Sequence, residues 1–125
     1  MDEKQIDDFE KVEAQLMGLL EEVQGLAKKS PDGGVNKFKL GHINAVVAAS
    51  NKLMNSTQRP FPDFEQFDDA EIPTNSDVLL ILRQYANCLE EVRAANIQEK
   101  YDSWYWTVKG KESDRRARPP SKLRK

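Results

Sequence analysis

The residues best suited to chemistry are two pairs of carboxylates at helical spacing. Glu10 and Glu13 stand three residues apart in one segment, and Glu99 and Asp102 do so in another. Side chains three apart share one face of a helix, and facing carboxylates can hold Mg²⁺ for phosphate chemistry. In a chain with 21 acidic residues such spacings also arise by chance. A Mg²⁺-dependent nucleotide phosphohydrolase is therefore the least favoured of three functional hypotheses.

Other site chemistries lack the residues that they need. His42 is the only histidine and Cys88 the only cysteine, so the chain cannot build a four-ligand structural zinc site or an HExxH site. Cys88 falls on an apolar helical stripe, which is typical of an inert core thiol. His42 is expected at the surface. The sequence thus predicts a protein that is not an enzyme, with no catalytic residue, no cofactor and no metal site.

Composition sets the scale of the fold and its compartment. The chain has 125 residues, of which 38% are hydrophobic and 32% charged, so one small domain must use nearly all of its apolar residues in one core. No apolar run is long enough for a membrane span, and the first residues lack the pattern of a signal peptide. A single cysteine favours a reducing compartment, and we expect a cytoplasmic protein.

Charge divides the chain into two unlike parts. Residues 1–108 carry a formal charge of −8 and residues 109–125 one of +6. We therefore expect a folded domain over 1–108 and a basic, flexible tail over 109–125, which either contacts an anionic partner or lies back on its own acidic body. The anion-contact candidates in the tail are Arg115, Arg116, Arg118, Lys122, Arg124 and Lys125.

Hydrophobic periodicity predicts an all-α fold, a three-helix bundle with helices at about 4–29, 36–56 and 75–101. The first helix carries a seam at alternating spacings of three and four, made by Phe9, Val12, Leu16, Leu19, Val23 and Leu26. Asn36 is the candidate N-cap of the second helix, and Thr74 is that of the third, with Asn75 and Ser76 as alternatives. Residues 57–74 form a long connection rich in aromatic and acidic side chains.

The third helix begins with a turn that is apolar on every side. Residues 78–82 are Val-Leu-Leu-Ile-Leu, which predicts that this helix is surrounded by the others and that Leu80→Asp would unfold the domain. Farther along, Glu90 and Arg93 are expected to face water. Residues 104–108 break the helical period without a second strand pattern to pair with, so an extended segment and a frayed helix end both remain open.

Two aromatic groups are candidates for partner contact. Phe61, Phe64 and Phe67 lie in the long connection, where they either cover the open end of the bundle or dock into a groove on a partner. Trp104, Tyr105 and Trp106 precede the basic tail, and such residues are enriched at binding hot spots. The helix-1 seam suits the protein's own core or a homodimer, and Leu16→Lys separates the two.

These observations favour a non-enzymatic helical module for protein–protein interaction, a small adaptor or assembly subunit of a cytoplasmic complex. The expected partner is another protein or a second copy of the chain bound through helix 1, and not a membrane. The alternative is a nucleic-acid-associated subunit that uses the tail, whose binding would weaken steeply with salt.

Overall fold

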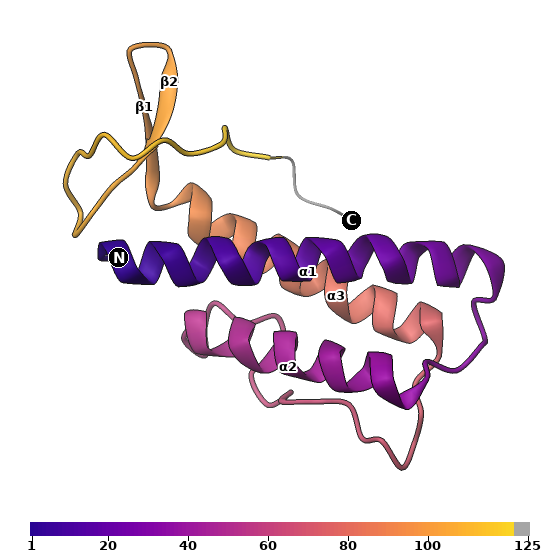
Figure 1. Cartoon of the computed structure of the whole chain (residues 1–125). Helices are drawn as coiled ribbons and strands as arrows, with labels where there is room; N and C mark the ends of the chain where they lie inside the picture. The colour runs from indigo at the N-terminus through magenta and orange to yellow at the C-terminus, as the bar shows by residue number, and fades with distance from the viewer. Residues whose placement is uncertain (122–125) are drawn as a thin grey trace.

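A computed structural model describes residues 1–121 of the chain, and these form three packed helices and a small hairpin (Figure 1). The helices are α1 (Glu3–Lys29), α2 (Lys37–Leu53) and α3 (Asn75–Ala94). The hairpin consists of β1 (Ile97–Lys100) and β2 (Ser103–Trp106). The predicted three-helix bundle is confirmed, with the hairpin as an addition. Within residues 1–121 no helix is both long and apolar enough to cross a membrane.

Each helix begins at a polar cap. The side chain of Asp2 accepts a hydrogen bond from the backbone N–H of Gln5, and the side-chain oxygen of Gln5 accepts one from the backbone N–H of Asp2. Asn36 and Thr74 accept in the same way from the third residue of α2 and of α3. The Asn36 cap is thus confirmed, and of the three candidates for α3 the cap is Thr74. A cap satisfies a backbone donor that the first helical turn leaves without a partner.

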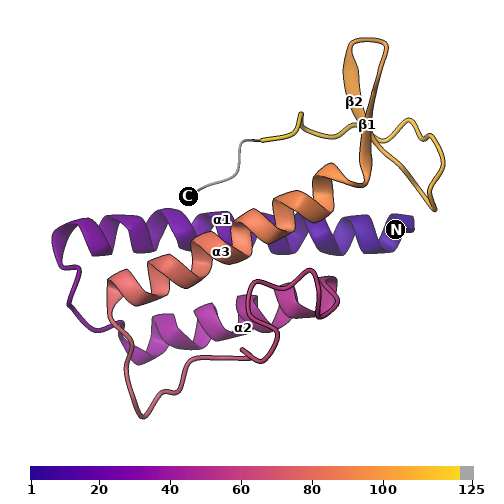
Figure 2. The same ribbon diagram turned by 180° about the vertical axis from the view of Figure 1, so that it is seen from behind.

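The core lies around α1, which contacts both other helices (Figures 1 and 2). The predicted seam is confirmed in part, because Leu19 and Leu26 remain half-buried while Ile6 and Leu20 are buried instead. Leu19 and Leu26 line a hollow between α1 and α2. The buried residues of α1 are Ile6, Phe9, Val12, Leu16, Leu20 and Val23.

The third helix ends at Ala94, seven residues before the predicted end at 101. Asn96 stops it: its side-chain amide donates to the Val92 carbonyl, and its own carbonyl accepts from the Thr107 backbone. The segment that follows pairs as a hairpin, with Ile97 opposite Trp106. Of the two alternatives for residues 104–108, the extended segment is therefore confirmed for 104–106, and its strand partner is β1, which the sequence pattern did not show.

The hairpin turn explains why this pairing was missed. Tyr101 and Asp102 both have positive φ, 52° and 60°. Positive φ at both central residues is the geometry of a type I′ turn, which asparagine and glycine normally supply. A Tyr-Asp pair does not carry that signal.

The exposure of Leu80 contradicts the prediction that the third helix is surrounded on all sides. Its side chain is 57% exposed, whereas Val78 and Leu82 on the same turn are completely buried. Because α3 packs on α1 along one face, the opposite face stays open to solvent, and α1 is the central helix. The expectation that Leu80→Asp would unfold the domain does not survive this geometry.

Leu16→Lys should abolish folding, because it places an unpaired charge where the side chain is fully buried, a change that costs several kcal/mol. Leu80→Asp is the matched control and should retain a cooperative melt near that of the wild type. Far-UV circular dichroism during heating distinguishes the two. A Leu16→Lys protein that melts like the wild type would show that α1 is not at the centre of the core.

Candidate interaction surfaces

The aromatic connection folds back over α2. Asn44 of α2 binds this connection through two hydrogen bonds. The Asn44 side-chain amide donates to the Phe67 carbonyl at 3.1 Å, and the Phe67 backbone N–H donates to the Asn44 side-chain oxygen at 2.8 Å. The ring of Phe64 lies 5.1 Å from that of Phe67 and 6.4 Å from that of Tyr85 on α3. Phe64 and Phe67 are half-buried against the core, and Phe61 is 36% exposed.

Asn51 makes the second attachment of this connection. Its amide donates to the Phe64 carbonyl at 3.0 Å, and its side-chain oxygen accepts from the Tyr85 hydroxyl at 2.8 Å. Burial raises the pKa of Tyr85 above its usual value, so the hydroxyl stays a donor. The two asparagines thus bind the connection to the bundle, and its phenylalanines cover the side between α2 and α3.

The Trp-Tyr-Trp segment forms β2 and is largely taken up by the protein itself. Trp106 is buried and meets Phe9 of α1 edge-on, with ring centroids 5.6 Å apart. Trp104 and Tyr105 are half-buried. The Lys100 ammonium lies 4.8 Å and the Arg116 guanidinium 5.5 Å from the centroid of the Tyr105 ring, both within the range of a cation–π contact.

The basic segment that follows returns along β2. The backbone of Trp106 donates to the Arg115 carbonyl at 2.8 Å, and the backbone of Ala117 donates to the Trp104 carbonyl at 2.9 Å. Residues 115–117 therefore lie beside the hairpin like a short third strand. In Figure 1 this segment continues along the side of α1 toward the described end of the chain.

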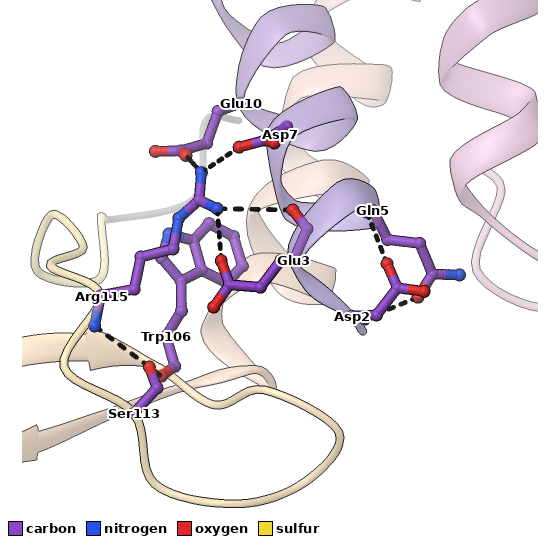
Figure 3. Close-up of polar contacts among 8 residues, drawn as sticks. All are labelled: Asp2, Glu3, Gln5, Asp7, Glu10, Trp106, Ser113 and Arg115. Atoms are coloured by element: carbon purple, nitrogen blue, oxygen red, sulfur yellow. Dashed lines mark hydrogen bonds and ion pairs between the residues drawn. The ribbon is translucent and has the colours of Figure 1, made fainter.

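Arg115 is clamped by a row of carboxylates on α1 (Figure 3). Its guanidinium lies 2.8 Å from Glu3 and 2.7 Å from Asp7, and it also pairs with Glu10. Hydrogen bonds to Glu3, then Asp7 and Glu10, raise the pKa of Arg115. Arg118 pairs with Glu13 one turn farther along. The predicted anion-contact candidates Lys122, Arg124 and Lys125 lie outside the described residues.

Arg93 is buried, which corrects the expectation that Glu90 and Arg93 face water. Arg93 is 1% exposed, and its guanidinium donates twice to Glu90, at 2.9 Å each. The same group donates to the carbonyls of Arg118, at 2.7 Å, and Pro119, at 2.8 Å. Glu90 in turn accepts from the backbone of Ser121. The three-residue spacing of Glu90 and Arg93 signals the ion pair, but only the returning chain explains its burial.

Glu13 lies at the junction of α1, α3 and this returning segment. Burial raises the pKa of its carboxyl, while Arg118 and Arg93 lower it. The Arg93 guanidinium is 3.7 Å from one Glu13 oxygen. Two arginines therefore compensate a carboxylate that the fold desolvates.

The carboxylate pairs do not face each other on two helices. Glu10 and Glu13 are engaged by Arg115 and Arg118. Glu99 lies on β1 and Asp102 in the hairpin turn, so the expected second helical pair was wrong. Residues 1–121 contain no group of three side chains placed to hold a metal ion. Cys88 is half-buried, and burial raises the pKa of its thiol.

A surface that the sequence did not reveal runs between α1 and α2. A hollow of about 220 Å³ opens there, lined mainly by apolar side chains. Glu22 and Lys39 form an ion pair of 3.0 Å at its rim. The apolar lining consists of Leu19, Val23, Leu26, Val35 and Ile43.

Phe38 stands beside this hollow at the start of α2. Its side chain is 77% exposed, and its ring meets that of His42, which lines the hollow, edge-on at 4.7 Å. The expected surface position of His42 is confirmed. The isolated position of Phe38 among Lys37, Lys39 and Gly41 gave no periodic signal of such a surface.

Comparison with protein-family models, with characterised proteins and with solved structures finds no match to this chain. Function is therefore inferred from the surfaces themselves.

Arg93→Met should destabilise the protein by about 3–5 kcal/mol, because removal of one partner leaves Glu90 and Glu13 buried without compensation. Arg83→Met on the same helix is the matched control and should cost less than about 0.5 kcal/mol. Urea unfolding followed by tryptophan fluorescence measures both. Equal midpoints for the two variants would show that the buried guanidinium does not hold the structure together.

Proposed function

We propose that the chain is a non-enzymatic helical module for protein–protein interaction, a small adaptor or assembly subunit of a cytoplasmic complex. The observation that supports this most is the exposure of Phe38 beside the apolar hollow between α1 and α2. A large aromatic side chain in water next to an apolar depression is typical of a contact site, since aromatic anchors and the pockets that receive them dominate interface energies.

Other large apolar side chains are also exposed, namely Phe61, Ile72, Leu80 and Tyr101. Tyr101 is 89% exposed at the tip of the hairpin, and Leu80 lies on the outer face of α3. Phe38 is distinguished by the contact of its ring with His42, which lines the hollow between α1 and α2. The combination of a protruding ring and an apolar hollow favours the surface between α1 and α2, termed below the α1/α2 face.

The size of the hollow favours a protein partner over a small molecule. Small-molecule sites usually measure about 300–1,000 Å³, whereas this hollow measures about 220 Å³. Its lining offers mainly apolar carbon, with the Glu22–Lys39 pair at the edge. Such a site suits one inserted side chain, supported by contacts around it.

Nucleic-acid association through the tail remains the alternative proposal. Arg116 is exposed and stacks on Tyr105, an arrangement that can also receive a phosphate or a base. Arg115 and Arg118 are engaged by carboxylates of α1. A phosphate backbone would have to displace these contacts first, and this cost places the alternative second.

Affinity capture from the native lysate, with the full chain as bait, tests the proposal. Phe38→Ser should lose the proteins that the wild type retains, because the aromatic anchor is gone. Leu80→Ser, which removes an exposed apolar side chain from a different helix, should retain them. Nuclease treatment should leave the wild-type result unchanged.

The competing outcomes are distinct. The same proteins captured by wild type and Phe38→Ser would contradict a contact site on the α1/α2 face. Loss of all captured proteins after nuclease treatment would instead support the nucleic-acid alternative.

A further inference from the structure

We infer that the hairpin, with the basic segment beside it, is a binding surface for single-stranded nucleic acid, and that carboxylates of α1 oppose this binding from within the chain. The inference rests on the alternative proposal above, nucleic-acid association, and is independent of the α1/α2 face. It names the surface, the kind of nucleic acid and the autoinhibitory contact.

The strand register places one aromatic ring and two cations on the same side of the sheet. Tyr105 is bridged to Arg116 of the returning segment, and Lys100 lies opposite Ser103, two residues before Tyr105. Opposite residues of antiparallel strands share a face, and so do alternate residues of one strand. Trp106, the next residue after Tyr105, lies on the other side and is buried. The side that carries Tyr105, Lys100 and Arg116 is therefore turned away from the core, and it is termed below the hairpin surface.

The chemistry of the hairpin surface suits a single strand. The Lys100 ammonium and the Arg116 guanidinium both lie over the Tyr105 ring, and Tyr101 at the hairpin tip is exposed. Single strands bind where cations meet the phosphates and flat groups stack on the bases, and both aromatic rings and guanidinium planes serve for stacking. A duplex keeps its bases stacked on one another, so it offers no free base to Tyr101 or Arg116.

The fold brings these groups together although the sequence separates them. The aromatic residues 104–106 and the basic residues 115–118 stand on either side of residues 107–114. Backbone hydrogen bonds from Trp106 to the Arg115 carbonyl and from Ala117 to the Trp104 carbonyl align the second group beside the first. Rings and cations are thus interleaved on adjacent strands, in the way that bases and phosphates alternate along a nucleic-acid strand.

Carboxylates of α1 compete with phosphate for this basic segment. The Arg115 guanidinium is engaged by Glu3, Asp7 and Glu10 along one side of the helix (Figure 3). Three carboxylates around one guanidinium leave a surplus of negative charge, which repels phosphate over about 8–10 Å at moderate salt. All three carboxylates are exposed, and exposed ion pairs contribute little stability each. A phosphate can therefore replace them, but α1 lowers the affinity.

Asp114 opposes binding on the hairpin surface itself. Its carboxylate is exposed and pairs with the Lys100 ammonium at 3.3 Å. The other acids of this region lie elsewhere: Glu99 alternates with Lys100 on β1 and so lies on the opposite side, and Asp102 and Glu112 lie outside the strands. The hairpin surface is thus a basic, aromatic patch restrained by α1 and by one carboxylate of its own.

Fluorescence anisotropy of a labelled oligouridine titrated with the full chain tests the restraint by α1. Asp7→Asn with Glu10→Gln should lower the Kd about tenfold, because two repelling charges are removed and Arg115 becomes available. The slope of log affinity against log salt should steepen by about 0.7, the value for one more phosphate contact on a single strand.

The matched control is Glu21→Gln with Glu22→Gln, which changes the net charge of the same helix by the same amount. Glu21 lies about 16 Å beyond Glu10 along the helix, farther than the screening length, so the Kd should change less than about twofold. Circular dichroism checks that both double variants keep the fold, since all four side chains are exposed. Equal Kd values for the two double variants would overturn the autoinhibitory contact.

Arg116→Gln tests the surface. It should raise the Kd of the oligouridine about tenfold, because one phosphate contact and its stacking plane are lost, whereas Lys37→Gln, which removes an exposed cation at the start of α2, should leave the Kd close to that of the wild type. Equal effects of Arg116→Gln and Lys37→Gln would overturn the hairpin surface, and a duplex that binds as tightly as the oligouridine would overturn the preference for a single strand.

These outcomes are separable from the proposed functions. Binding that depends on Arg116 but is the same in both carboxylate double variants leaves the nucleic-acid alternative standing, and the autoinhibitory contact is wrong. No binding by the wild type or by any variant removes that alternative together with the inference. The leading proposal is decided separately, by the proteins that Phe38→Ser does or does not retain.

Discussion

The buried guanidinium of Arg93 holds together parts of the chain that are far apart in sequence. It joins Glu90 on its own helix, Glu13 on α1, and the carbonyls of residues 118 and 119 in the returning segment. A guanidinium presents five donors in a fixed plane, and burial is tolerable only when those donors are paired. The returning backbone supplies two of the acceptors. The buried charge of Arg93 therefore requires the C-terminal segment to lie against α3, where its carbonyls can accept from the guanidinium.

This constraint determines what remains available on α1. One side of the helix forms the core with α2 and α3. A second side carries the row of carboxylates that receives Arg115 and Arg118. The opposite charges of the two parts of the chain thus meet within one molecule over the described residues. The third side, where Leu19 and Leu26 are half-buried beside α2, stays open. The proposed contact site is this remaining side.

What could be predicted from the sequence is local. The caps at Asn36 and Thr74 and most of the seam of α1 depend on residues within one or two turns, so spacing alone indicated them. Leu80 shows the limit of this local information. A turn of α3 that is apolar on every side does not reveal which of its sides no other element covers. The burial of Arg93 depends on residues 25 or more positions away, and no periodicity reports such a contact.

The candidate site was missed for a related reason. Phe38 is one apolar residue in a polar turn, and its meaning depends on the hollow that α1 and α2 create beside it. The aromatic residues that the sequence did single out are mostly packed against the protein itself, as Trp106 against Phe9 and Phe64 against Phe67. Aromatic clusters in a small domain are needed for its core.

Amide hydrogen exchange followed by NMR in the wild type and in Arg93→Met tests most directly that the buried guanidinium holds the returning segment in place. The backbone of Ala117 donates to the Trp104 carbonyl in that segment, so the account predicts that Arg93→Met accelerates exchange of the Ala117 amide more than that of the buried amides of α2. Exchange at Ala117 that is equal in the wild type and in Arg93→Met would contradict it.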